Sequence, residues 1–227
     1  MTIYFEPEIL QAAPGLRVLA VEAEVDNSPT PDALWAEIEA EGAKLRQQVP
    51  IEQVNKLRGI LPTRQAYKAC GKEPNRYRPS AEALTRRMVK GVDLYRTLTL
   101  IDLINLLSLR TGHSIGGFDA DRVQGQELHL GVGREMEPFD AIGRGTLNIC
   151  HLPCYRDAEG AIGTPTSDCE RTKLSEDTRR LLMLVNVYDT AEDMQRLREQ
   201  ISDLLPRYNC VITEVKEYHA STGCSMS

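Results

Sequence analysis

The sequence has no long apolar run and none of the common nucleotide-binding or hydrolase motifs. No stretch approaches the roughly 18 to 20 apolar residues that a membrane helix needs. Glu6 and Glu8 stand where a signal peptide would carry basic residues. We therefore expect a soluble, cytoplasmic protein that does not engage a membrane. GxGxxG, a Walker loop, GxSxG and HExxH are all missing, so the sequence gives no support for a nucleotide cofactor or for the commonest hydrolase classes, and no cofactor is expected.

Cysteine is also scarce, with six in 227 residues. This number is too small for a disulfide scaffold in a chain of this length, so reduced thiols are expected. The spacing around His151 fits zinc poorly, because strong zinc sites use paired CxxC or HxxxH knuckles. Buried, unreactive thiols are the better interpretation, and we expect no metal. The cysteines are Cys70, Cys150, Cys154, Cys169, Cys210 and Cys224.

Charge is abundant but unevenly distributed. The whole chain carries a formal charge of −6, which argues against a protein devoted to nucleic acid and gives no reason to expect DNA binding. Residues 56–96, however, hold eleven basic and three acidic side chains. Such a segment can bind a polyanion by releasing counterions, and Tyr67, Tyr77 and Tyr95 among the charges suit stacking on unpaired bases. The alternative is a solvated helix face that pairs with the acidic remainder.

The first half of the chain predicts one strand followed by helices. Residues 17–25 alternate between apolar and charged side chains, which is typical of a half-buried strand. Apolar residues at helical spacing predict a helix over residues 31–49. The polar run over residues 64–79, broken by glycine and prolines, predicts a loop-rich connection after one helical turn. Two further helices are expected over residues 80–90 and 98–109, the second of them buried and carrying Asp102 and Asn105.

The second half changes to short strands and glycine turns. Strands are expected over residues 126–132 and 145–152, and the apolar run at residues 181–188 predicts a central strand buried on both faces. A helix over residues 190–205 and a strand over residues 210–215 follow. Because helices and strands segregate along the chain, the pattern indicates an α+β fold.

Two polar, glycine-bearing turns are candidates for a binding site. They cover residues 111–119 and 160–172. Glycines let the backbone approach a ligand closely, and neighbouring hydroxyls and carboxylates can bind sugar hydroxyls or an amino group. The two turns can line one pocket, but ordinary hairpin turns would explain them equally well. For Asp102 and Asn105, a structural hydrogen bond is favoured over catalysis.

Three segments of the chain resemble a known family. RYRPSAEALTRRMVKG at residues 76–91, LIDLINLLSLRTGHSIGGFDAD at residues 100–121 and GTPTSDCERT at residues 163–172 resemble the B3/B4 domain of the phenylalanyl-tRNA synthetase β subunit, in its free-standing form. The resemblance covers roughly residues 60–188. It implies an α+β layered β-sandwich with packed helices, forming a single domain over residues 1–227. Residues 1–60 would be an N-terminal strand-helix extension and residues 190–227 a C-terminal helix-strand extension.

The resemblance also implies a function and a set of site residues. In the family, this domain hydrolyses tyrosine mischarged onto phenylalanine tRNA, but the editing histidine of the family aligns with Gly116 here. A water would then be positioned by Asp119, Ser167 or Asp168. The pocket would be formed by Ser114, Gly116, Gly117, Gly163, Thr164 and Thr172.

We therefore expect a protein that binds tRNA or aminoacyl-tRNA, with hydrolysis of mischarged aminoacyl-tRNA in trans as a possible activity. Phosphates would meet the basic segment at Arg64, Lys68, Arg76, Arg78, Arg86 and Arg87. The alternatives are a small-molecule or protein-binding module that kept the fold without RNA binding, and a structural subunit of a larger complex. The oligomeric state is left open.

Overall fold

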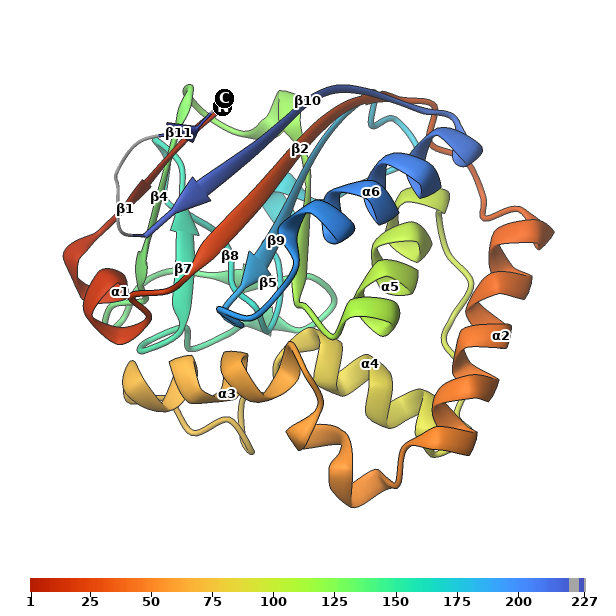
Figure 1. The fold of residues 1–227 in the computed structure, drawn as a ribbon. Helices are drawn as coiled ribbons and strands as arrows, with labels where there is room; N and C mark the ends of the chain where they lie inside the picture. Colours follow the sequence, from red (N-terminus) through yellow and green to blue (C-terminus); the bar gives the residue numbers. More distant parts are fainter. Residues whose placement is uncertain (221–224, 227) are drawn as a thin grey trace.

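The computed structural model describes residues 1–220 and the backbone of residues 225–226. Its strands form a five-stranded sheet in the order β11-β10-β2-β9-β3, a four-stranded sheet in the order β1-β4-β7-β8, and a small hairpin of β5 and β6 (Figure 1). The strands are β1 Thr2–Phe5, β2 Arg17–Val25, β3 Ile115–Asp119, β4 Glu127–Val132, β5 Asp140–Ala141, β6 Gly145–Thr146, β7 Pro153–Arg156, β8 Ala161–Gly163, β9 Arg180–Val187, β10 Cys210–His219 and β11 Ser225–Met226. Cys224 lies outside the described residues.

Helices cover one face of the five-stranded sheet, and the four-stranded sheet covers the other (Figure 1). The α-helices are α1 Pro7–Ala12, α2 Asp32–Gln48, α3 Ile60–Ala69, α4 Ser80–Val89, α5 Thr99–Thr111 and α6 Met194–Leu204. The layered α+β sandwich expected from the sequence is therefore confirmed. In the part of the chain that the structure describes, no helix has the length and apolar character that crossing a membrane requires.

Strand β2 is more deeply buried than its alternating pattern predicts. Leu19 and Val21 face the helices, as expected. Val18 and Ala20 on the opposite face pack against the four-stranded sheet, so this part of the strand is buried on both faces. The expectation of a half-buried strand is wrong here, because the second sheet covers the face that the sequence pattern assigns to solvent. The expectation for β9 is confirmed, since its side chains are buried on both faces.

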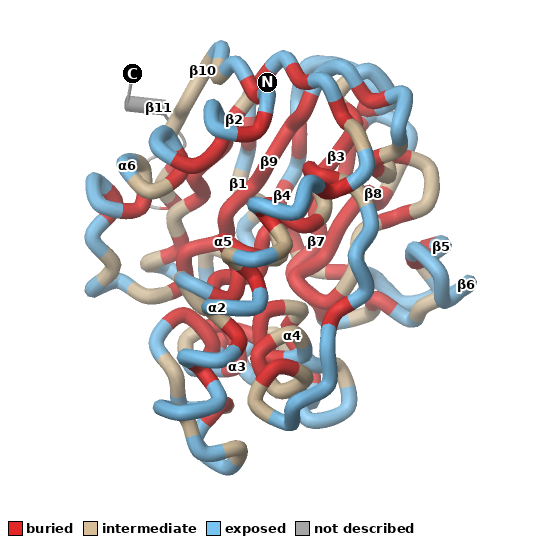
Figure 2. The backbone as a smooth tube through the Cα atoms, turned by 90° about the vertical axis from the view of Figure 1, so that its right-hand side faces the viewer, coloured by how far each residue is buried: buried red, intermediate tan, exposed pale blue. Residues whose placement is uncertain are grey.

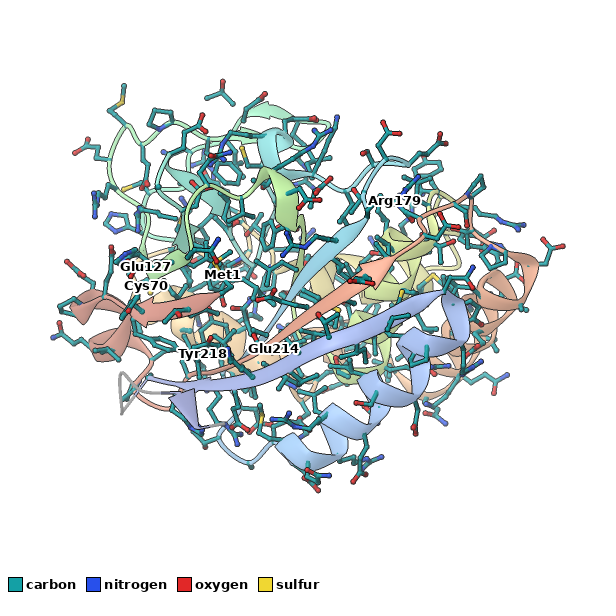
Figure 3. All side chains as sticks on the ribbon, turned by 90° about the horizontal axis from the view of Figure 1, so that it is seen from above. Met1, Cys70, Glu127, Arg179, Glu214 and Tyr218 are labelled. Atoms are coloured by element: carbon teal, nitrogen blue, oxygen red, sulfur yellow. The ribbon has the colours of Figure 1, made fainter. Side chains whose placement is uncertain are left out.

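The segments expected to be extensions are central to the five-stranded sheet. Strand β2 lies between β9 and β10, and both pairings are antiparallel. Strand β1, which the sequence pattern does not reveal, pairs in parallel with β4 at the edge of the other sheet. The hydroxyl of Tyr218 on β10 donates to the carbonyl of Met1 at 2.6 Å, and both residues are marked in Figure 3. The division into a domain with two extensions stays a prediction.

Two segments differ from the local expectation. Residues 64–69 belong to helix α3, whose buried face includes Tyr67, so the loop begins later than the polar composition indicates. In the strand expected over residues 145–152, only Gly145–Thr146 pair with another strand. The Asn148 side chain accepts a hydrogen bond from the Cys150 amide at 2.9 Å, and this local turn replaces strand pairing.

Candidate functional site

An apolar cavity of about 230 Å³ lies where helices α4 and α5 meet strand β3. Strand β3 is one of the two outer strands of the five-stranded sheet, and β8 is one of the two outer strands of the four-stranded sheet. In the segment after β8, Asp168 forms a bridge with Gly163 and lies in the cavity wall. The remaining wall is Ser80, Leu84, Ile101, Ile104, Asn105, Ser108, Ile115, Gly117, Ile142, Lys173 and Leu174.

Asp168 is the carboxylate of this cavity. One of its oxygens, Oδ2, accepts a hydrogen bond from the Gly117 amide at 3.1 Å. The side chain is half-buried, and burial raises the pKa of Asp168 to about 7, against the lowering effect of that hydrogen bond. A carboxyl group that changes charge near neutral pH in a cleft is suited to proton transfer.

Glycines make room for this arrangement. A Cβ atom on Gly117 would lie 2.3 Å from Cδ1 of Ile104, and one on Gly163 would lie 2.9 Å from Oδ1 of Asp168. Both distances are shorter than real Cβ contacts, so an added side chain would force Ile104 or Asp168 to shift. The two glycine-bearing turns expected to share a pocket do meet, through Gly117 and Asp168.

A second hollow, of about 540 Å³, adjoins the apolar cavity and carries cationic side chains. Three residues, Ser80, Leu84 and Asn105, line both spaces. The other wall residues of the hollow are Arg76, Tyr77, Arg78, Ala83, Arg144, Leu147 and Thr166. Arg76, Arg78 and Arg144 are exposed, so an anion can reach them. An anionic group in the hollow would therefore lie beside an apolar group in the cavity.

Tyr77 is held in the wall of this hollow by a buried lysine. The Lys72 ammonium lies 3.7 Å from the centre of the Tyr77 ring. It also donates to the carbonyls of Asn148 and Cys150, at 3.0 and 2.6 Å. Burial lowers the pKa of Lys72. These contacts hold the loop that carries Arg76 and Arg78.

Not all of the basic segment is available to a polyanion. Arg64 is buried and forms an ion pair with the fully buried Glu82 at 2.7 Å, and Arg86 pairs with the same carboxylate at 2.7 Å. The interpretation of Arg64 and Arg86 as phosphate contacts is therefore corrected, because Glu82 already holds both guanidinium groups. Arg87 donates to the carbonyl of Asp93 and lies over Tyr95.

Lys68 lies in helix α3 with the buried Arg64 and Tyr67, but it is itself exposed. A polyanion can therefore reach it. Tyr67 is fully buried, and its hydroxyl lies 2.8 Å from that of Thr166. The structure therefore corrects the expectation that Tyr67 is free to stack on bases.

The other predicted catalytic residues lie outside the cavity. Asp119 accepts from the amide of Asp121 and from the hydroxyl of Thr178, which makes it a cap for the turn after β3. Ser167 lies in a tight turn in which its amide donates to the hydroxyl of Thr164. Of the three residues predicted to position a water, the geometry brings Asp168 alone to the cavity wall.

Four other predicted pocket residues lie outside the cavity wall and contact neighbouring parts of the fold. Ser114 accepts from the Ala81 amide at 3.4 Å. A Cβ atom on Gly116 would meet the Phe118 ring at 2.8 Å. Thr164 closes the turn before Asp168, and Thr172 is buried. None of these four residues is in the cavity wall.

Helix α5 supplies one structural and one accessible polar side chain. Asp102 is fully buried and accepts from the Thr30 hydroxyl at 2.5 Å and from the Thr97 amide at 2.9 Å. The structural interpretation of Asp102 is therefore confirmed. Asn105 donates to Asp102 at 3.3 Å and also lines both the cavity and the hollow.

The sequence interpretation missed Arg144 and the lining roles of Ser80 and Lys173. Arg144 lies far from the basic segment along the chain, between Gly143 and Gly145, and the available signal was this glycine-flanked cation. Among the described residues, no group of three or more His, Cys, Asp or Glu side chains is arranged to hold a metal ion. The five cysteines within that range are free thiols; burial raises the pKa of Cys70 and Cys210 to about 11.

Comparisons with known proteins identify similar sequences and a similar fold. A family model described as the B3/4 domain matches residues 62–208. Similar curated proteins include the phenylalanine–tRNA ligase beta subunits of Bartonella henselae, 28% identical over 127 residues, and of Bartonella quintana, 28% identical over 106 residues. These matches cover 54% and 46% of this chain, but they span only 16% and 13% of those proteins.

The fold is similar to that of a solved N-terminal fragment of the phenylalanyl-tRNA synthetase beta subunit from Pyrococcus horikoshii. The TM-score is 0.50 at 14% sequence identity. The similarity covers 95% of this chain and 51% of that one, so nearly the whole described fold has a counterpart there.

Proposed function

Because the chain belongs to the B3/4 domain family, we propose that it binds the aminoacylated 3′ end of a tRNA and hydrolyses mischarged aminoacyl-tRNA in trans. One observation carries this proposal: a hollow with three exposed arginines and an apolar cavity with one carboxylate share three wall residues. The similarity to phenylalanine–tRNA ligase beta subunits supports a tRNA as the polyanion. The proposed place of action is the cytoplasm.

The two spaces match the two halves of such a substrate. Backbone phosphates of the RNA end would bind Arg76, Arg78 and Arg144. One guanidinium group can donate two parallel hydrogen bonds to the oxygens of a phosphate. The Tyr77 ring in the same wall offers a surface on which the terminal base can stack. The amino-acid side chain would enter the apolar cavity, which places the ester bond near Asn105 and Ser80 at the shared wall.

Asp168 would act as the general base of the hydrolysis. Its carboxylate takes a proton from water as the water oxygen attacks the ester carbonyl. The bond to the ribose oxygen then breaks, and the proton passes to that oxygen, giving the free amino acid and the uncharged tRNA. A pKa of about 7 suits this task, because the group exists in both forms at neutral pH. The Gly117 amide holds the carboxylate in place.

A deacylation panel tests the proposal. The purified protein is incubated with tRNAs charged with each amino acid, and loss of the ester is measured over the spontaneous rate. We expect hydrolysis of some mischarged species, a 100-fold or larger loss in Asp168→Asn, and wild-type rates in Asp121→Asn, an exposed carboxylate outside the cavity.

Binding to uncharged tRNA tests the arginine hollow separately. Affinity should fall steeply between about 50 and 200 mM salt, and the double variant Arg76→Glu/Arg78→Glu should abolish binding. Binding without deacylation of any species would restrict the function to RNA binding. Salt-independent, weak binding to every RNA, together with binding of a free amino acid, would favour a small-molecule module instead.

A further inference from the structure

The hairpin formed by β5 and β6 connects the two halves of the proposed site. Its turn places Ile142 in the wall of the apolar cavity and Arg144, two residues later, in the wall of the cationic hollow. The hairpin projects from the body of the molecule, and its tip is exposed (Figure 2). Resting on the proposed function, we infer that Arg144 is a specificity residue that makes the protein select acylated RNA ends over free amino acids.

The turn at this tip leaves the Arg144 side chain available to a ligand. Gly143 and Gly145 flank it with φ angles of +66° and +69°, a region that glycine adopts without strain. A Cβ atom on either glycine would meet nothing within 4 Å, so the space beside both glycines is open. Among residues 1–220, no carboxylate pairs with the Arg144 guanidinium, which is therefore free to bind a phosphate.

The hairpin is bonded directly to the segment that carries Asp168. The Ile142 amide donates to the carbonyl of Asp168 at 3.1 Å. Ala141 forms a bridge with Cys169, and the Gly143 amide donates to the carboxylate of Glu170 at 3.0 Å. Three successive hairpin residues thus contact residues 168–170, so the backbone of the turn that carries Arg144 is held beside the segment of Asp168.

Isolated two-residue strands have little stability of their own, so these three contacts hold the hairpin in place. A phosphate bound to Arg144 then lies within reach of one arginine side chain from the cavity wall. A ligand that carries a phosphate and an amino acid at the correct separation contacts Arg144 and the apolar wall together. A free amino acid contacts the apolar wall alone. Because covalent linkage makes the second contact intramolecular, the affinity of the linked ligand exceeds that of either half.

Binding measurements with stable probes test the inference. The linked probe is a CCA trinucleotide whose terminal ribose has an amino group in place of its 3′-hydroxyl. Leucine is joined to this amino group through an amide bond, which resists hydrolysis. The two half probes are unmodified CCA and leucinamide. Leucine is chosen because the apolar wall of the cavity is aliphatic. We expect the wild-type protein to bind the linked probe at least tenfold more tightly than either half.

Two hairpin variants and one control separate the contributions. Arg144→Ala should weaken binding of the linked probe about tenfold and change the affinity for leucinamide less than twofold. Ile142→Ala should weaken both probes, because it removes part of the cavity wall. Arg180→Ala removes an exposed arginine that pairs with Asp121, outside both spaces, and should bind all three probes as the wild type does.

The outcomes distinguish this inference from the proposed function. If Arg144→Ala binds the linked probe as tightly as the wild type while Arg76→Ala weakens it, the hairpin inference is refuted and the proposed function stands. If the wild type binds none of the probes and deacylates no tRNA, the proposed function fails and the inference fails with it. Circular dichroism of each variant confirms that the fold is retained.

Discussion

Replacing Asp168 by asparagine should stabilise the protein at alkaline pH while it removes the proposed catalytic base. The asparagine side chain has the same shape and can still accept the hydrogen bond from the Gly117 amide. It carries no charge, however, and so avoids the cost of placing a carboxylate in the cavity wall. The charged Asp168 would then lower the stability of the folded state while it supplies the proposed catalytic base.

The size of the effect follows from the pKa of Asp168, which burial raises from 3.8 to about 7. A shift of this size corresponds to about 4 kcal/mol of unfolding free energy at pH 8. Asp168 is only half-buried, so solvent screens part of its charge, and we expect about 1 to 3 kcal/mol.

The pH dependence has a definite sign. Because the folded state binds the Asp168 proton more tightly than the unfolded state does, wild-type stability falls as the pH rises from about 4 to about 7. The neutral asparagine lacks this loss. The stability difference between Asp168→Asn and wild type should therefore be greatest above pH 7 and vanish near pH 4.

Urea denaturation at pH 4, 5.5 and 8 measures the difference. Asp121→Asn serves as the control, because this carboxylate is exposed. The reasoning is refuted if Asp168→Asn is less stable than wild type at pH 8, or if the stability difference does not change with pH.

Three substitutions test the other contacts. Arg64→Ala removes one partner of the fully buried Glu82 and should cost about 3 kcal/mol of unfolding free energy in urea denaturation; a loss below about 0.5 kcal/mol would contradict a structural role. Gly117→Ala forces the Ile104 side chain to shift, so it should cost about 1 to 3 kcal/mol and weaken leucinamide binding by calorimetry. Lys72→Met should lower the melting temperature by several degrees, since a loss of about 1 kcal/mol shifts it by about 2 to 4 °C, and an unchanged melting temperature would refute the proposed anchoring.

The sequence predicts those elements whose burial follows a local pattern. Helix α4 and strand β9 are visible in the periodicity of their apolar residues, and both appear at nearly the expected positions. The sequence offered a shared pocket of the two glycine turns only as one of two equal interpretations, because glycine, hydroxyl and carboxylate residues also form ordinary turns. In the structure the two turns meet where the Gly117 amide donates a hydrogen bond to the Asp168 carboxylate.

Other features depend on partners that are distant in the sequence. Arg64 and Arg76 cannot be distinguished by their place in the basic segment. In the structure, Arg64 is buried in an ion pair with Glu82 on the next helix, whereas Arg76 is exposed. Strand β1 has too few residues for a clear pattern, and its parallel pairing with β4 is a tertiary contact. Arg144 enters the hollow because the hairpin docks on residues 168–170, which no local pattern encodes.

The hydrogen bond between the Gly117 amide and Asp168 also provides a spectroscopic probe. An amide proton that points at a carboxylate changes its resonance frequency when that carboxylate gains or loses charge. A single glycine signal in a ¹H–¹⁵N correlation spectrum therefore reports the ionisation of Asp168 directly, without any substrate. The same signal would report the arrival of a ligand in the cavity, in solution.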